Sequence, residues 1–114
     1  MKKFLVLYQS PISASAQMAN ATPEQAKAGM AAWMGWMKQN EGALVDGGSP
    51  LGDVALVTRS GTTRGTSRIT GYSIVQGDSI DDVSRRFAQH PHLHTPGDAD
   101  IQILEFLSLP GMSG

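Results

Sequence analysis

Hydrophobic residues along the chain alternate in some stretches and recur every three or four positions in others, and this predicts six elements of secondary structure. The first strand carries apolar side chains on both of its faces, with Phe4, Val6 and Tyr8 on one and Leu5 and Leu7 on the other. Strands buried on both sides have this pattern. The sequence predicts strands at residues 3–9, 54–58, 69–76 and 101–107 and helices at residues 23–40 and 79–90.

Both predicted helices begin with a capping box, in which side chains bond the free backbone amides of the first turn. Thr22-Pro23-Glu24-Gln25 begins the first helix, with proline at the first helical position, and Ser79-Ile80-Asp81-Asp82 begins the second, which Pro91 ends. Each helix has one apolar stripe. The stripe residues are Ala26, Met30, Trp33 and Met37 in the first helix, with Trp36 just outside it, and Ile80, Val83 and Phe87 in the second.

The resulting order, βαββαβ, predicts an α+β fold: a ferredoxin-like antiparallel sheet with both helices on one face. Residues 3–9 and 101–107 are also apolar on the opposite face, and uncovered apolar faces normally mark an interface. We therefore expect a homodimer that closes sheet on sheet with two-fold symmetry. The alternative is that the polar loops 10–22 and 59–68 fold back over this face.

Length and charge narrow the class of protein further. The chain has 114 residues, no cysteine and a formal net charge of -1, which predicts a single domain (1–114) and excludes a disulfide scaffold. A near-neutral chain is not expected to bind nucleic acid or an anionic membrane. An RNA-recognition module of the same order would need more stacking aromatics than Tyr72 on its third strand. The apolar run of residues 4–8 is too short for a secretory signal, so a cytoplasmic location is expected.

Several motifs, in order and over nearly the whole chain, resemble those of the YCII-related family, in the branch called the DGPF domain. They are Lys3-Phe4-Leu5-Val6-Leu7-Tyr8, Trp33-Met34-Gly35-Trp36, Leu44-Val45-Asp46-Gly47-Gly48-Ser49-Pro50-Leu51, Gly71-Tyr72-Ser73-Ile74-Val75, His90-Pro91-His92-Leu93 and Glu105-Phe106-Leu107-Ser108-Leu109-Pro110-Gly111-Met112. The resemblance implies a dimeric α/β barrel with a cleft in each subunit between the sheet and its neighbouring loops.

The resemblance also implies a His/Asp pair for acid-base chemistry in some members, such as dehydrochlorination of a chlorinated hydroxyquinol. In those members the histidine is expected on the first helix, but residues 23–40 contain none. Asp46 matches the acidic position. The pair is therefore incomplete at its usual place.

All three histidines lie in His90-Pro91-His92-Leu93-His94. A neutral imidazole can accept a proton near pH 7, and a carboxylate such as Asp46 can orient it. His92 is the preferred catalytic candidate, with Asp46 and then His90, because His90 lies at a helix end where it would cap carbonyl groups. The structural alternative is that His90-Pro91 only ends the helix. Metal binding by alternate histidines with Asp98 or Asp100 is a further alternative, and no metal or cofactor is expected.

The segment Asp46-Gly47-Gly48-Ser49-Pro50 is a candidate ligand-binding loop, because two glycines let backbone amides approach a ligand. It is equally interpreted as a turn or bulge between strand pieces. Tyr8 and Tyr72 are expected to line a pocket from the sheet, whereas Trp33 is expected in the core. Two hypotheses follow: a homodimer that binds a small molecule, or a cofactor-independent lyase or hydrolase that uses His92 or His90 with Asp46.

Overall fold

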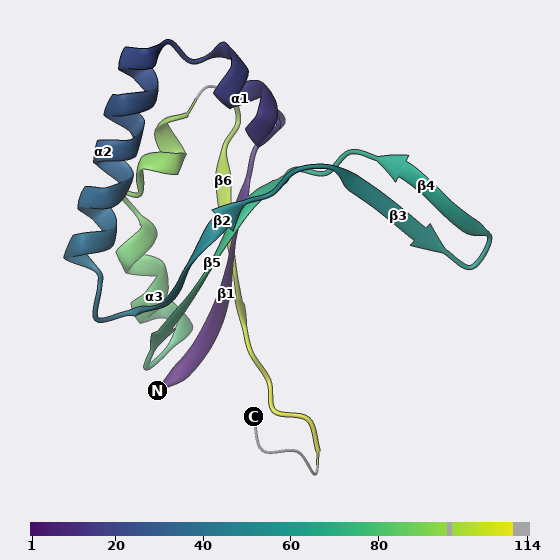
Figure 1. The fold of residues 1–114 in the computed structure, drawn as a ribbon. Coiled ribbons are helices and arrows are strands. Elements are labelled where there is room, and N and C mark those ends of the chain that lie inside the picture. The colour runs from purple at the N-terminus through teal and green to yellow at the C-terminus, as the bar shows by residue number, and fades with distance from the viewer. Residues whose placement is uncertain (96, 111–114) are drawn as a thin grey trace.

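Four antiparallel strands form the sheet of the computed structural model, which describes residues 1–95 and 97–110 (Figure 1). Their order across the sheet is β2 (Leu44–Pro50), β5 (Ile69–Gly77), β1 (Lys2–Gln9), β6 (Asp100–Glu105). A separate two-stranded ribbon contains β3 (Val54–Thr58) and β4 (Gly61–Gly65). The helices are α1 (Ala14–Asn20), α2 (Pro23–Gln39), α3 (Ile80–Phe87) and the 3₁₀ helix η1 (Pro91–His94). The predicted α+β class with an antiparallel sheet is confirmed.

The second strand of the sheet is not the predicted one. Residues 54–58 do form a strand, but β3 pairs only with β4, in the ribbon. The place beside β5 is taken by β2, whose sequence Asp46-Gly47-Gly48 indicated a turn. The chain stays paired through this segment because it bulges, with register shifts between Leu44 and Asp46 and again between Asp46 and Ser49.

Both long helices begin where the capping residues predict. Thr22 Oγ1 accepts a hydrogen bond from the Gln25 amide, and Gln25 Oε1 accepts one from the Thr22 amide. Ser79 Oγ accepts one from the Asp82 amide at the start of α3. The expected loop 10–22, in contrast, contains α1, which Ser13 caps. This helix has no buried residue, so it leaves no hydrophobic stripe in the sequence to reveal it.

The buried face of α2 is rotated from the predicted stripe. Trp36, expected beside the stripe, is the buried residue of this helix, and its indole Nε1 donates to the carbonyl oxygen of Arg86 at 3.0 Å. Met30 is 62% exposed, while Trp33 and Met37 are half-buried at the border of the core. The indole needs a hydrogen-bond partner when buried, and the Arg86 carbonyl of α3 supplies one to Trp36.

The core lies between the sheet and the helices α2 and α3, which cover one face (Figure 1). It contains Phe4, Val6 and Tyr8 of β1, Val75 of β5, Trp36 of α2, and Val83 and Phe87 of α3. On the other face Leu5, Leu7 and Ile74 are half-buried and Leu104 is 42% exposed. The β3–β4 ribbon projects away from the sheet rather than folding over it (Figure 1).

In the part of the chain that the structure describes, no helix combines the length and the apolar character needed to cross a membrane.

Candidate functional site

A cavity of about 500 Å³ opens between α1, α2 and the bulged edge of the sheet. Volumes of roughly 300–1,000 Å³ are typical of small-molecule sites. Apolar side chains dominate the helix side, where α1 contributes Met18 and α2 contributes Met30, Trp33 and Met37. The sheet and η1 contribute the polar groups, which include Asp46, Ser49, Thr70 and His92.

The structure brings together seven of the eight residues that the sequence indicated for a site. The cavity is lined by Tyr8, Asp46, Gly47, Gly48, Ser49, Tyr72 and His92, which come from three strands and η1. His90 is the exception, because it is fully buried in the core. Trp33, for which the core was preferred over a pocket position, packs against the core and also lines the cavity.

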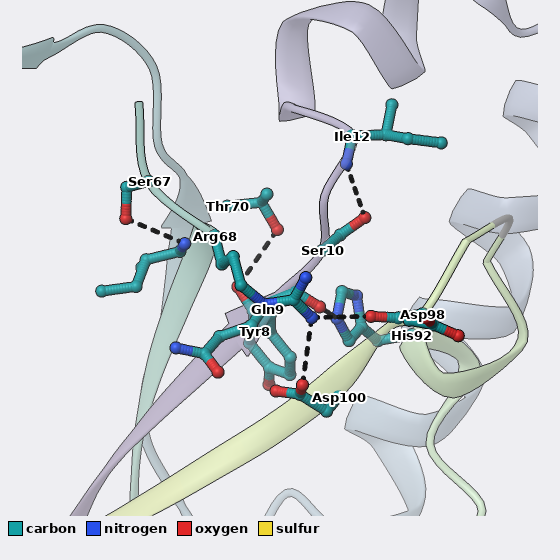
Figure 2. Close-up of polar contacts among 11 residues, drawn as sticks. Tyr8, Gln9, Ser10, Ile12, Ser67, Arg68, Thr70, His92, Asp98 and Asp100 are labelled. Carbon is teal, nitrogen blue, oxygen red and sulfur yellow. Dashed lines mark hydrogen bonds and ion pairs between the residues drawn. The ribbon is translucent and has the colours of Figure 1, made fainter. Parts of the chain in front are cut away.

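His92 is held against the end of β1 by a backbone carbonyl. Its Nε2 lies 2.8 Å from the carbonyl oxygen of Gln9 (Figure 2). A carbonyl oxygen only accepts, so Nε2 carries the proton, and Nδ1 of the neutral ring keeps its lone pair. Nδ1 makes no hydrogen bond to the described residues. His92 thus lines the cavity with one ring nitrogen bonded to the protein and the other free of a partner in the described part of the chain.

His90 has a structural position instead. Its Nδ1 accepts a hydrogen bond from the His92 amide at 3.0 Å and so caps η1. Its Nε2 is buried with no partner among the described residues. The ring packs among Tyr8, Trp33, Trp36 and Phe87, with centroid distances of 4.5 Å to both tryptophans. Burial lowers the pKa of His90 to about 4, and the nearby His92 adds to this shift.

Asp46 organises the bulge in β2. Its Oδ1 accepts from the Gly48 amide at 2.8 Å, as in an Asx turn, and its Oδ2 accepts from the Tyr72 hydroxyl at 3.3 Å. Tyr72 pairs with Leu7 in the sheet, so strand alternation places its side chain on the face opposite Tyr8. Asp46 and His92 both line the cavity, but the bond to Tyr72 directs the Asp46 carboxylate towards that opposite face. No hydrogen bond joins Asp46 and His92 in the described chain: Gln9 is the partner of His92 Nε2, and Gly48 and Tyr72 are the partners of the Asp46 oxygens.

A buried chain of hydrogen bonds connects the core to this bulge. Ser73 Oγ lies 2.9 Å from the Gly47 carbonyl oxygen and 2.9 Å from the Tyr8 hydroxyl. Because the carbonyl can only accept, the serine donates to Gly47 and must accept from Tyr8. Burial raises the pKa of Tyr8, and the bond to Ser73 offsets part of that rise. The Tyr8 hydroxyl is therefore committed to the protein, and Tyr8 borders the cavity as a core residue that is only 2% exposed.

Sequence reasoning missed Ser73, the Gln9 carbonyl and Met18 of α1. Ser73 could have been predicted as a hydrogen-bonding residue, because it lies opposite the buried Val6 in the sheet. A polar residue on a buried face needs a hydrogen-bond partner. A backbone carbonyl and an unpredicted helix give no such signal in the sequence.

The residues considered as metal ligands, the alternate histidines with Asp98 or Asp100, do not form a metal site. Asp100 pairs with Arg68 at 3.1 Å, and the same guanidinium donates to the carbonyl oxygen of Asp98 (Figure 2). Within residues 1–95 and 97–110, no three His, Cys, Asp or Glu side chains lie close enough together to hold a metal ion.

The fold and the site together define an α+β protein with a largely apolar cavity at the edge of its sheet. Models of known protein families give no match to this chain, and neither do the curated proteins.

Proposed function

We propose that this chain is a YCII-related protein that binds a small, largely apolar molecule in the cavity beside Asp46 and His92. The observation that carries the proposal is the lining itself. Flexible methionines and an indole surround a few oriented polar groups, which is the composition of ligand sites in general. The polar groups are held by the protein before any ligand arrives, because Gln9 fixes His92 while Gly48 and Tyr72 fix Asp46.

Filling the cavity should abolish binding without unfolding the protein. Gly29 lines the cavity from α2, and a β-carbon at this position meets no atom within 4 Å. The β-carbon of a Gly29→Phe side chain therefore meets no obstacle, and the ring should extend into the ligand space. Replacing glycine inside a helix also favours the helix. We expect benzyl alcohol to quench or shift the fluorescence of Trp33 in the wild type and to lose that effect in Gly29→Phe.

The matched control is Gly35→Phe. Gly35 lies on the same helix, its β-carbon would also meet no atom within 4 Å, and it does not line the cavity. This variant should bind benzyl alcohol like the wild type. Equal binding by all three proteins would contradict a ligand site in this cavity.

We also propose the ferredoxin-like arrangement and a homodimer that closes into an α/β barrel. The ribbon can be treated as an insertion between β2 and β5, and the remaining elements then follow the order βαββαβ with the sheet order β2-β5-β1-β6. A second copy would cover the face that bears Leu5, Leu7, Ile74 and Leu104.

A charge on that face should separate the two copies. Leu104 is 42% exposed on the edge strand β6, so Leu104→Glu should leave the sheet folded while it places a carboxylate in the proposed interface. We expect the wild type to sediment at micromolar concentration with twice the 12.1 kDa mass of the chain, and Leu104→Glu as a single chain.

Ile80→Glu serves as the comparison, since Ile80 is 46% exposed but lies on α3 at the opposite face of the sheet. This variant should remain a dimer. A wild-type protein that sediments as one chain would refute the proposal.

A cofactor-independent lyase or hydrolase is the second candidate function, and the orientation of His92 favours it. A neutral imidazole whose Nε2–H is fixed by a carbonyl is set to accept a proton at Nδ1. Asp46 would not orient the imidazole, because its carboxylate is bonded to Gly48 and Tyr72 instead. In that case His92→Gln would remove turnover and retain binding, whereas Gly29→Phe would remove both.

A further inference from the structure

The β3–β4 ribbon receives little support from its own chain. In the described residues β3 and β4 pair only with each other, and every residue of the two strands except Val54 is exposed. Leu56 is 56% exposed and Val57 is 73% exposed. An isolated two-stranded hairpin is only marginally stable in water and gains stability when it packs against another surface. The ribbon is therefore an element that a partner surface would stabilise.

The two faces of the ribbon differ in charge. Strand alternation and the cross-strand register assign each residue to one face. The uncharged face carries Val54, Leu56, Thr58, Gly61, Thr63 and Gly65. The opposite face carries Ala55, Val57, Thr62 and Arg64. Arg64 pairs with Asp53 at 3.3 Å, so charge is confined to this opposite face. Charged side chains keep exposed strands from associating, and the uncharged face has none.

We propose that the ribbon is a dimerisation arm whose uncharged face packs against a second copy of this chain. This inference rests on the proposed homodimer and names the element through which each copy holds the other. The helices lie to one side of the sheet, and the ribbon extends towards the other side (Figure 1). A copy that closes over Leu5 and Leu7 would therefore lie beside the ribbon. Two-fold symmetry would then place its own ribbon against the first copy.

The exposed area of the chain fits a large interface of this kind. Its accessible surface is 8075 Å², whereas a folded monomer of 12.1 kDa is expected to expose about 6,000 Å². The difference of roughly 2,000 Å² lies within the range of about 1,000–2,500 Å² that each chain buries in an obligate homodimer. A second copy would cover the sheet face and the ribbon in one association, because the same chain presents both surfaces.

Adjacent residues on the two faces of the ribbon provide a matched test. Leu56→Glu puts a carboxylate on the uncharged face, and Val57→Glu puts one on the opposite face. In sedimentation equilibrium we expect Leu56→Glu to raise the dimer dissociation constant at least about tenfold, because an unpaired charge would be buried. Val57→Glu should stay within about twofold of the wild type. Both residues are exposed in the single chain, so both variants should keep the wild-type circular dichroism spectrum.

Hydrogen exchange of the ribbon amides gives a second measurement. These amides should exchange at least about tenfold more slowly in the wild-type dimer than in Leu104→Glu, the variant expected to be a single chain. Leu104 belongs to β6 and not to the ribbon, so its substitution should reach the ribbon amides only through loss of the partner.

The results separate the arm from the homodimer itself. A wild-type dimer that Leu56→Glu leaves intact would overturn the arm and leave the homodimer standing, as would equal exchange of the ribbon in the wild type and in Leu104→Glu. Loss of the dimer in Val57→Glu to the same extent as in Leu56→Glu would overturn the assignment of the uncharged face. A wild-type protein that sediments as one chain would contradict the homodimer, and the arm with it.

Discussion

Replacing Gly48 with alanine should destabilise the folded protein by roughly 3 kcal/mol, the largest effect we expect from the addition of one methyl group. Gly48 has φ +82°, where a side chain is strained, and a β-carbon at this position would overlap the carbonyl oxygen of Tyr72. Neither the strain nor the contact can be relieved without separating β2 from β5. Chemical denaturation followed by circular dichroism measures the loss.

Gly52→Ala is the appropriate control for this variant. Gly52 lies just beyond β2, its β-carbon would meet no atom within 4 Å, and its φ is not positive. This change should alter the free energy of unfolding by less than about 0.5 kcal/mol. If Gly48→Ala were as stable as Gly52→Ala, the bulge described in β2 would be incorrect.

Acid should destabilise the protein through His90. Its pKa is about 4 in the folded state against 6.5 for the free side chain, because burial disfavours the charged ring. Between these two values the unfolded chain binds the proton and the folded chain does not, so stability is complete above about pH 6.5 and falls as the pH decreases towards 4. A shift of this size corresponds to roughly 3 kcal/mol over the window.

The measurement is the free energy of unfolding from pH 7 to pH 4 in the wild type and in His90→Asn. Asparagine still offers an acceptor to the His92 amide but cannot titrate, so this variant should start less stable and lose less on acidification. His94→Asn changes an exposed histidine of the same 3₁₀ helix and should keep the wild-type slope. Parallel curves for the wild type and His90→Asn would show that His90 is not the source of the acid sensitivity.

Three of the four strands of the central sheet and the starts of α2 and α3 were predictable because local chemistry determines them. Phe4, Val6 and Tyr8 alternate with Leu5 and Leu7, and the capping residues Thr22 and Ser79 bond amides only three residues away. Most of the candidate site was predictable for a related reason. Glycines beside an acid and tyrosines on strands are unusual enough to stand out from their neighbours.

The remaining features depend on contacts distant in the sequence. Gly48 continues a strand only because Tyr72 lies beside it, and Trp36 replaces Met30 in the buried stripe only because the Arg86 carbonyl is available to its indole. His90 and His92 are two residues apart and look equivalent in the sequence. They differ in the structure because the His90 ring packs in the aromatic cluster, whereas the His92 ring lies against the Gln9 carbonyl.

The base of the β3–β4 ribbon has a consequence for how the chain tolerates changes in length. The Leu51 amide donates to the carbonyl oxygen of Thr70 at 2.9 Å, and Pro50 pairs with Gly71, so the sheet is already closed where the ribbon departs. Lengthening or shortening the ribbon alters only the entropy of a loop whose ends are fixed, a term that grows slowly with length. Insertions, deletions and substitutions in the ribbon should therefore leave the four-stranded sheet and the cavity unchanged.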